Sequence, residues 1–241
     1  MLYGIFSDVH SNLEAFETAL SFYRVKAIDK FIFLGDIVGY GANPNQCIGL
    51  LKKLGPVCIA GNHDWAAIDE FDISYFNFAA KEAILWTKKE LLEENIKYLR
   101  TFELAYQEDD FICVHGSLDS PEKFNYIFDI SDAQLNFSYL ENKICFIGHS
   151  HRMQAFCREN DSVSQIGDYE IKLKKSAEYI INVGSIGQPR DADPRLSLCL
   201  YDSDYKIVKF VRLEYNVKKA ADKIIEQGLP LVLAERLYLG R

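Results

Sequence analysis

Five short stretches of this sequence each end an apolar run with aspartate or histidine side chains. The clearest is Ile59 to Asp64, in which Gly61 is followed by Asn62, His63 and Asp64. Gly61 has no Cβ, so the backbone can turn sharply there and come close to a ligand. Asn62 offers a neutral oxygen, His63 a group that titrates near neutral pH, and Asp64 a carboxylate that can orient an imidazole. Such a tetrapeptide is suited to metal binding or to proton transfer, and read alone it is equally a turn followed by a surface histidine.

Four further stretches repeat the pattern and favour the chemical reading. They cover residues 5–10, 31–36, 111–116 and 144–151. The chain contains 5 histidines, and all of them lie in these five stretches: His10, His63, His115, His149 and His151. Histidines used for packing or solubility would also occur in helices and polar loops. Their confinement to the ends of apolar runs predicts one shared site.

The apolar runs are predicted to be strands that deliver these side chains. Residues 2–6, 31–34 and 57–60 read as strands and alternate with helical patterns, the second of which ends at Gly55-Pro56. Ser11 and Glu14 form a capping-box pattern at the start of the first helix. A βαβαβ order predicts a sheet whose active edge lies at the carboxyl ends of its strands.

The rest of the chain predicts further helices and a second group of strands. Residues 74–93 and 94–99 are helical in pattern, 102–106 and 111–114 form a hairpin, and 217–227 form a closing helix. Five strand-like runs follow His151, at residues 153–158, 163–173, 179–183, 196–201 and 205–213. We expect these runs to form a meander that supplies a second sheet, in a single domain spanning residues 1–241.

Length and composition bound the class of protein. The 241 residues suffice for one α/β domain, and 49% apolar with 26% charged residues is ordinary for a soluble globular protein. No apolar run is long enough to span a membrane. The N-terminus carries no basic segment and reaches Asp8 too soon for a signal peptide. We therefore expect a cytoplasmic protein without membrane association.

Cysteine usage and net charge limit the compartment and the kinds of binding partner to be expected. The 6 cysteines form no CxxC pair, which is typical of a reduced compartment and argues against a zinc finger. A net charge of −8 argues against non-specific binding to nucleic acid. An anionic substrate remains compatible, because bound divalent cations dominate the field around their own site.

The side chains at the five strand ends form a mixed oxygen and nitrogen donor set without thiolate. The candidate ligands are Asp8, His10, Asp36, Asn62, His115, His149 and His151. This set suits manganese, iron, zinc or cobalt better than calcium or magnesium, which prefer oxygen alone. Seven ligands are too many for one ion. They suffice for two ions that share one carboxylate and keep open positions for water and substrate.

A pair of ions has a defined chemistry. Two ions roughly 3.5–4 Å apart can hold one hydroxide and bind two oxygens of a phosphoryl group, which stabilises an in-line displacement. An acid on the far side must then donate a proton or a hydrogen bond to the departing oxygen. His63 is the candidate for this acid, with Asp64 holding its ring.

Taken together, the five stretches resemble the five ordered motifs of the calcineurin-like metallophosphoesterases. The motifs here are Asp8-Val9-His10, Gly35-Asp36 with Gly39, Gly61-Asn62-His63-Asp64, His115-Gly116 and Gly148-His149-Ser150-His151. Residues 35–41 and 182–190 are also similar to segments of the small prokaryotic branch of that superfamily. The resemblance implies an α/β fold, a four-layer αββα sandwich of two packed mixed β-sheets flanked by helices.

The resemblance also implies how the ligands are divided. The first metal takes Asp8, His10, Asp36 and His151. The second takes Asp36 as the bridge, with Asn62, His115 and His149. His63 is then the histidine that contacts the phosphate or the leaving group. Manganese is the first choice for both ions, with iron, zinc, cobalt or nickel as alternatives.

Two residues outside these motifs are candidates for substrate binding. Tyr40, between two glycines, can stack on a base or lean over the phosphate, and its alternative role is to pack on the adjacent helix. Arg190 can bind a phosphate oxygen with its planar fork, or it can pair with the acids that follow it, Asp191 and Asp193. Two other arginines are substitutes for it, Arg152 and Arg195.

The sequence therefore predicts a metal-dependent phosphoesterase acting on a small phosphodiester, a phosphomonoester or a nucleotide polyphosphate. Loops 119–132 and 184–193 are expected to select the substrate. A protein Ser/Thr phosphatase with the same centre is the main alternative, although the chain is short for it and shows no insertion that would form a peptide groove. A non-catalytic scaffold of the same fold is disfavoured by the complete ligand set. The oligomeric state is open, and a homo-oligomer is compatible with the sequence.

Overall fold

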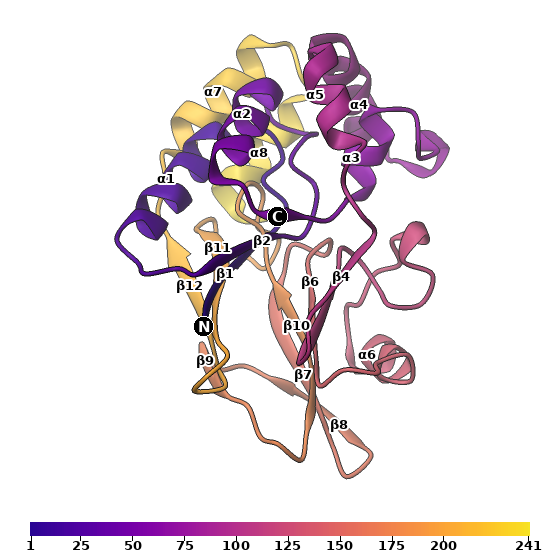
Figure 1. Cartoon of the computed structure of the whole chain (residues 1–241). Helices are drawn as coiled ribbons and strands as arrows, with labels where there is room; N and C mark the ends of the chain where they lie inside the picture. The colour runs from indigo at the N-terminus through magenta and orange to yellow at the C-terminus, as the bar shows by residue number, and fades with distance from the viewer.

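In the computed structural model, which describes residues 1–241, the strands form two sheets of six strands each (Figure 1). The strands of the first sheet are β1 (Leu2–Phe6), β2 (Lys30–Phe33), β3 (Val57–Cys58), β9 (Glu170–Lys172), β11 (Leu196–Asp202) and β12 (Ile207–Leu213). They are arranged in the order β3-β2-β1-β11-β12-β9. Strand β1 pairs parallel with β2 and antiparallel with β11, so the sheet is mixed.

The second sheet is also mixed. Its strands are β4 (Ala105–Gln107), β5 (Phe111–Val114), β6 (Ile144–Ile147), β7 (Met153–Glu159), β8 (Ser162–Ile166) and β10 (Glu178–Val183). They follow the order β4-β5-β6-β10-β7-β8, in which β5, β6 and β10 are parallel. The predicted hairpin is present, because β4 pairs antiparallel with β5.

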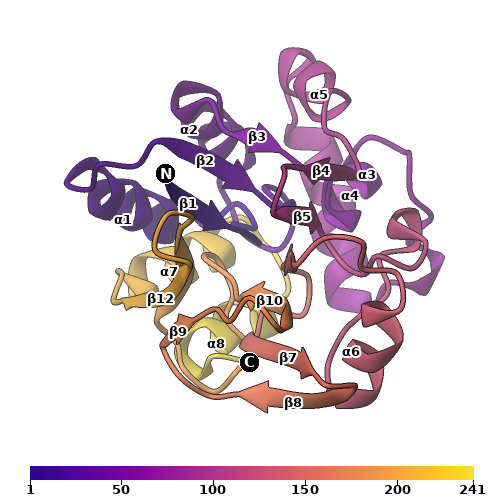
Figure 2. The same ribbon diagram turned by 60° about the horizontal axis from the view of Figure 1, so that its bottom comes forward.

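Helices form the two outer layers (Figure 2). They are α1 (Leu13–Arg24), α2 (Pro44–Leu54), α3 (Asn62–Ala67), α4 (Phe78–Glu90), α5 (Glu93–Leu99), α6 (Ile130–Phe137), α7 (Val217–Glu226) and α8 (Leu231–Leu239), with 3₁₀ turns at Ile73–Tyr75 and Pro121–Lys123. Helices α1, α2 and α7 lie on the side of the first sheet, and α6 packs on β7, β8 and β10 of the second. No helix has the length and apolar character needed to cross a membrane.

The layer between the sheets is built from aromatic residues of both. Tyr3 and Tyr201 of the first sheet contact Phe111 and Phe146 of the second. The ring centroids of Tyr3 and Phe111 lie 5.2 Å apart, and those of Tyr201 and Phe146 lie 5.4 Å apart. Burying these large side chains together is a dominant stabilising contribution of such a core. It fixes the two sheets face to face and brings their strand ends to one side.

Two predictions about elements were wrong, and one helix was missed. The strands after His151 do not form a separate sheet. Strands β11, β12 and β9 extend the first sheet, whereas β7, β8 and β10 extend the second. The pairing of β1 with β11 joins residues almost two hundred positions apart, such as Ile5 and Cys199, and a local pattern does not encode such pairing.

The other two corrections concern helix ends. Helix α1 is capped by Asn12, whose side chain accepts a hydrogen bond from the Ala15 N–H, and not by Ser11. Helix α8 was not predicted, because the helix at residues 217–227 was expected to close the chain. Pro230 is the N-cap of α8, and the two helices form a hairpin that packs against α1 and α4.

Candidate metal centre

The predicted ligands converge at the carboxyl ends of strands from both sheets. Asp8 and His10 follow β1, Asp36 follows β2, and His115 follows β5. The remaining three complete the set: Asn62 at the start of α3, with His149 and His151 after β6. All seven are buried, with exposed fractions of 7% or less. Chain segments that are far apart in the sequence thus meet in one polar cluster below the protein surface.

Several ligand residues have backbone conformations that non-glycine residues rarely adopt. Positive φ angles occur at Asp8 (53°), His10 (46°), Asp36 (62°), His149 (64°) and His151 (58°). Each costs about 1–2 kcal/mol relative to ordinary backbone, so the surrounding structure must hold it in place. The loops after β1 and β2 do this for each other, since the N–H groups of Asp8 and His10 donate to the carbonyls of Gly35 and Asp36, both at 2.9 Å.

Gly61 allows the backbone to approach Asp36 closely, in agreement with the close approach predicted for this glycine. A Cβ at this position would lie 1.9 Å from Oδ1 of Asp36 and 2.5 Å from the Asp36 backbone nitrogen. No side chain could be accommodated without moving Asp36. Oδ1 of Asp36 also accepts the His63 N–H at 2.8 Å, so the turn and the carboxylate form one unit.

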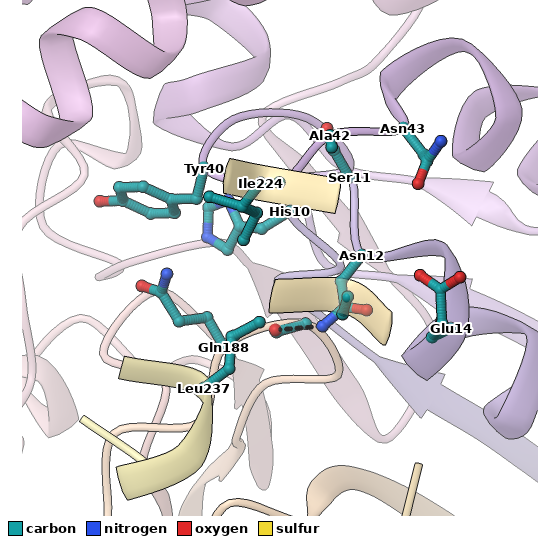
Figure 3. Close-up of a pocket in the computed structure, with 13 residues that line it drawn as sticks. His10, Ser11, Asn12, Glu14, Tyr40, Ala42, Asn43, Gln188, Ile224 and Leu237 are labelled. Atoms are coloured by element: carbon teal, nitrogen blue, oxygen red, sulfur yellow. Dashed lines mark hydrogen bonds between the residues drawn. The ribbon is translucent and has the colours of Figure 1, made fainter. Parts of the chain in front are cut away.

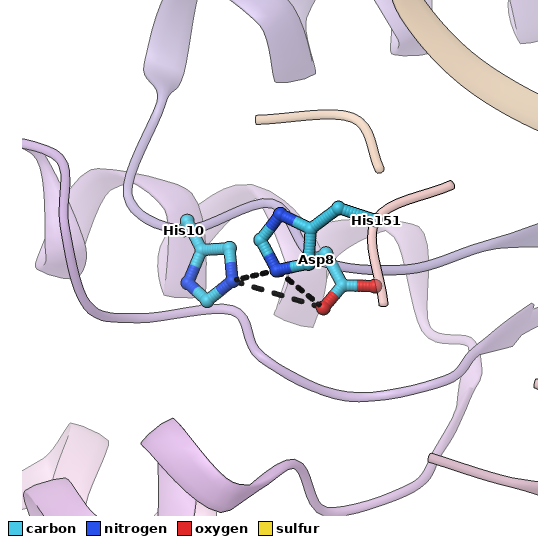
Figure 4. Close-up of side chains that lie close together, drawn as sticks. All are labelled: Asp8, His10 and His151. Carbon is cyan, nitrogen blue, oxygen red and sulfur yellow. Dashed lines mark hydrogen bonds and ion pairs between the residues drawn. The ribbon is translucent and has the colours of Figure 1, made fainter. Parts of the chain in front are cut away.

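Asp8, His10 and His151 form one group of donor atoms (Figure 4). Oδ1 of Asp8 lies 3.3 Å from Nε2 of His151 and 3.7 Å from Nε2 of His10. The two Nε2 atoms are 3.0 Å apart. One oxygen and two nitrogens therefore face a common point, as the ligands of a single ion must.

Asp36, His115 and His149 form a second group beside the first. Oδ2 of Asp36 lies 3.4 Å from Nε2 of His115, which is 3.1 Å from Nδ1 of His149. The same Asp36 oxygen is 3.6 Å from Nε2 of His10, which belongs to the first group. Asp36 thus occupies the position between the groups that a shared carboxylate would take.

Backbone carbonyls orient three of the imidazoles. Nδ1 of His10 lies 2.9 Å from the Val38 carbonyl oxygen, and Nδ1 of His115 lies 2.7 Å from that of Leu34. Nδ1 of His151 lies 2.6 Å from the Gln188 carbonyl. A carbonyl can only accept, so each ring carries its proton on Nδ1 and turns the lone pair of Nε2 inward. Outer hydrogen bonds of this kind are typical of metal-binding histidines.

Three buried atoms of the cluster have no hydrogen-bond partner. They are Oδ1 of Asp8, Oδ1 of Asn62 and Nε2 of His149. Buried polar atoms in native proteins are almost always paired, and an unpaired one costs about 1–3 kcal/mol. Burial also holds the pKa values of His149 and His151 well below their usual range, so both rings are neutral and can bind a cation. The residues present therefore fit divalent metal ions.

His63 lies at the edge of this cluster with its ring held by Tyr40. Nε2 of His63 is 3.1 Å from the Tyr40 hydroxyl, and the two ring centroids are 4.4 Å apart. Nδ1 is buried without a partner and faces Gly39, where a Cβ would lie 2.4 Å away. His63 also falls within reach of His10 and Asp36. Its neutral form is favoured, because burial lowers its pKa well below the usual value.

The predicted role of Asp64 in holding the His63 ring is wrong. Both Asp64 oxygens instead accept backbone N–H groups, from Asp36 at 2.7 Å, Gly61 at 3.1 Å and Ile37 at 2.9 Å. Asp64 is the third residue of α3, where a side chain turns back to cap the helix start. Burial raises its pKa to about 7, and the backbone donors oppose that shift. Asp64 therefore joins the turns after β2 and β3, and the side chain that bonds the His63 imidazole is Tyr40.

Tyr40 is both a packing residue and a neighbour of the ligands. It is buried in a cluster with residues of α4, α7 and α8. Its ring centroid lies 4.6 Å from that of His10. Figure 3 shows Tyr40 and His10 on one wall of a small pocket that Ile224 of α7 and Leu237 of α8 help to close. The α7–α8 hairpin thus packs against Tyr40, whose hydroxyl is hydrogen-bonded to His63.

Arg190 is not paired with the acids that follow it, so that alternative is wrong. Asp191 pairs with Arg212. Asp193 pairs with Arg195 at 2.7 Å and also lies 4.0 Å from Arg212. The Arg190 guanidinium instead lies 5.4 Å above the Tyr40 ring and donates to Oε1 of Gln188 at 2.9 Å. A cation without a carboxylate partner therefore stands beside the metal ligands.

Two features of the site were missed in the sequence. The Tyr126 ring stacks on His149, with centroids 3.9 Å apart and an angle of 17° between the planes. Burial and the Arg190 guanidinium lower the pKa of Arg236, a residue of α8. Residues 119–132 were predicted as a loop that selects the substrate, without a role for Tyr126, and α8 was not predicted. The spacing of aromatic residues at 124, 126 and 128 was the available signal.

Comparison with known proteins gives consistent matches. The calcineurin-like phosphoesterase superfamily domain matches residues 1–206. An uncharacterized protein of Methanocaldococcus jannaschii is 40% identical over 244 residues, which cover 99% of this chain and 98% of that protein. The crystal structure of a metallophosphoesterase from Sphaerobacter thermophilus is 37% identical, with a TM-score of 0.87 over 100% of this chain and 99% of that one.

A more distant structure shows the same fold. A hypothetical protein from Pyrococcus horikoshii is 20% identical and has a TM-score of 0.80, covering 100% of this chain and 98% of that one. The predicted four-layer arrangement of two mixed sheets between helices is thereby confirmed. With its cluster of aspartate and histidine ligands, this chain belongs to the calcineurin-like phosphoesterase superfamily and is a metal-dependent phosphoester hydrolase.

Proposed function

We propose that this chain is a single-domain enzyme that holds two divalent ions, manganese in the first place, and hydrolyses small phosphodiesters, phosphomonoesters or nucleotide polyphosphates by in-line displacement. The position of Asp36 carries this proposal, because one of its oxygens faces histidines of both donor groups. The unpaired buried acceptors on either side support it. When bound, the ions would supply activated water and neutralise the charge of the phosphoryl oxygens.

The residues divide into two ligand sets under this proposal. Asp8, His10 and His151 would hold one ion together with Asp36. Asn62, His115 and His149 would hold the other, again with Asp36. The mixture of carboxylate, amide and imidazole donors suits first-row transition metals.

His63 and Tyr40 are proposed to act together on the leaving group. A neutral imidazole donates a hydrogen bond from one nitrogen and accepts one at the other. A ring that rotates freely would therefore turn its acceptor nitrogen, and not its N–H, toward the leaving group part of the time. The Tyr40 hydroxyl, bonded to Nε2, limits that rotation. The neutral His63 ring can then donate an N–H hydrogen bond to the departing oxygen, and assistance to a leaving group contributes about 10²–10⁴-fold in comparable enzymes.

Arg190 is proposed to bind a non-bridging phosphate oxygen. The arginines that form ion pairs in this structure are Arg158, Arg195 and Arg212. Arg190, whose guanidinium lies 5.4 Å from the Tyr40 ring, forms none of these pairs, and neither does Arg236, whose pKa is lowered by burial and by the Arg190 charge. An anionic substrate bound at Arg190 would supply the negative charge that this guanidinium lacks.

Purified protein assayed with Mn²⁺ tests the proposal. It should hydrolyse bis-p-nitrophenyl phosphate, p-nitrophenyl phosphate or a diadenosine polyphosphate, lose that activity on chelation and regain it on adding Mn²⁺. Metal analysis should give two ions per chain. Activity that resists chelation, or no activity on any ester, would contradict the proposal, and a preference for a phosphopeptide panel would favour the protein phosphatase alternative.

A further inference from the structure

A pair of exposed aromatic residues extends from the metal centre to the surface. The segment from Phe124 to Phe128 links the 3₁₀ turn at Pro121–Lys123 to α6. Tyr126 is 44% exposed and Phe128 is 41% exposed, whereas Ile127 between them is 2% exposed. Large aromatic side chains that stay half exposed beside a buried active site are candidates for contact with a ligand.

The two rings are held parallel and in line with a metal ligand. Tyr126 and Phe128 stack with centroids 4.7 Å apart and an angle of 11°. The other side of Tyr126 stacks on His149 at 3.9 Å. The three rings form a continuous stack. A ligand group that contacts Phe128 is therefore separated from His149 by the rings of Phe128 and Tyr126.

The backbone of this segment is fixed, which keeps the stack in place. The carbonyl of Ile127 accepts a hydrogen bond from Gln154 at 3.0 Å, and the N–H of Phe128 donates to Asp132 at 2.8 Å. Ile127 itself packs in the core beneath α6. The exposed rings are therefore presented by an anchored segment and lose little conformational freedom when a ligand binds.

A guanidinium without a neutralising acid lies at the Phe128 end of the stack. The Arg152 guanidinium is 5.1 Å from the Phe128 ring centroid, and Arg152 forms none of the ion pairs in the structure. A planar cation is therefore available beside the exposed rings.

We infer that Tyr126 and Phe128, with Arg152, form a subsite for the planar base of a nucleotide whose phosphate is cleaved at the metal centre. This inference rests on the proposed function and narrows its substrate to esters that carry a nucleobase. Aromatic faces and a guanidinium plane are the groups that stack on bases. An aliphatic ester would gain nothing from them.

Two p-nitrophenyl esters with the same leaving group test the subsite. We expect kcat/KM for thymidine 5′-p-nitrophenyl phosphate to exceed that for ethyl p-nitrophenyl phosphate by about tenfold or more, the size of one base stacked on an aromatic side chain. Phe128→Ala should reduce this ratio about tenfold, mainly through KM. Phe128 is preferred to Tyr126 for substitution because it does not touch a metal ligand. Tyr205→Ala is the matched control, since Tyr205 is 68% exposed in the turn between β11 and β12.

Calorimetric binding of thymidine 5′-phosphate and ethyl phosphate provides a readout that needs no turnover. The nucleotide should bind about tenfold more tightly than ethyl phosphate to the wild type, and equally to Phe128→Ala. Equal kcat/KM and equal affinity for the two compounds in the wild type would overturn the subsite while leaving the hydrolase intact. If neither ester is cleaved, the proposed function fails, and the calorimetric comparison still decides the subsite.

Discussion

The metal centre and the segment from Phe124 to Phe128 are neighbours built in opposite ways. In the centre, Asp8 and Asp36 are 0% and 1% exposed, and strained backbone is held by hydrogen bonds between loops. In the segment, Tyr126 and Phe128 are more than 40% exposed, although hydrogen bonds fix the backbone that carries them. The difference separates two tasks. Breaking the P–O bond depends on buried groups with little freedom, whereas selecting the substrate depends on exposed groups that can be exchanged at low cost in stability.

The largest effect is expected from Asp36→Asn. The substitution removes the charge of the carboxylate that faces both donor groups, so activity should fall by at least about a thousandfold, because several kcal/mol of charge stabilisation depends on the ions. Metal analysis should show fewer than two ions per chain. The control is Asp204→Asn, an exposed aspartate that pairs with the N-terminus. Full activity in Asp36→Asn would show that catalysis does not depend on the buried centre, and would contradict its separation from the exposed segment that selects the substrate.

A smaller loss is expected from His63→Ala. Activity should fall by about 10²–10⁴-fold, the usual contribution of a general acid, and the loss should be greater for esters with poor leaving groups. Both ions should remain, as metal analysis would show. Loss of the ions together with activity would instead identify His63 as a ligand, which its position near His10 and Asp36 allows.

Tyr40→Phe should lower kcat about tenfold with little change in KM. The ring that packs against α4, α7 and α8 is kept, and only the hydroxyl bonded to His63 is lost. Steady-state kinetics separates the two parameters. Tyr23→Phe is the matched control, because Tyr23 is buried and its hydroxyl has no partner. A higher KM at constant kcat would show that Tyr40 contacts the substrate and does not position His63.

The smallest effect is expected from Glu14→Gln, and it concerns stability. Glu14 anchors α7 through Lys223 at 2.6 Å and Lys219 at 3.1 Å. Burial raises the pKa of Glu14, but the hydrogen bonds from these lysines outweigh burial and lower it. The stabilisation is therefore present above the unfolded-state pKa and is lost as the pH falls through the lower folded-state value.

Urea unfolding of the wild type and Glu14→Gln measures this contribution. The variant should be less stable by about 1 kcal/mol at pH 7, and the difference should shrink as the pH is lowered below about 4. A difference that is constant with pH would show that packing, and not charge, joins α7 to α1. Turnover by the variant at pH 7 should be close to that of the wild type, since the Glu14 carboxylate bonds the α7 lysines and no metal ligand.

The convergence of the ligands was predictable because each motif follows an apolar run. Parallel strands such as β1 and β2 place their carboxyl ends at one edge, so Asp8 and Asp36 must approach each other once the strands pair. The close approach of Gly61 followed from its missing side chain. These inferences need only local sequence and the general geometry of sheets.

The contacts that the sequence did not reveal are tertiary ones. The sequence around Asp64 does not show what its carboxylate binds. Its partners include backbone N–H groups of a different turn, those of Asp36 and Ile37. Tyr40 meets His63 because α7 and α8 fold back over it from the end of the chain. Tyr126 stacks on His149 from the irregular segment between the 3₁₀ turn and α6. Each contact joins positions whose pairing no local pattern specifies.

Anomalous diffraction from a crystal of this protein grown with Mn²⁺ tests the two-ion proposal most directly. We predict two anomalous peaks, one bounded by Asp8, His10 and His151 and the other by His115, His149 and Asn62, with the Asp36 carboxylate between them. A single peak, or peaks away from these side chains, would contradict the account.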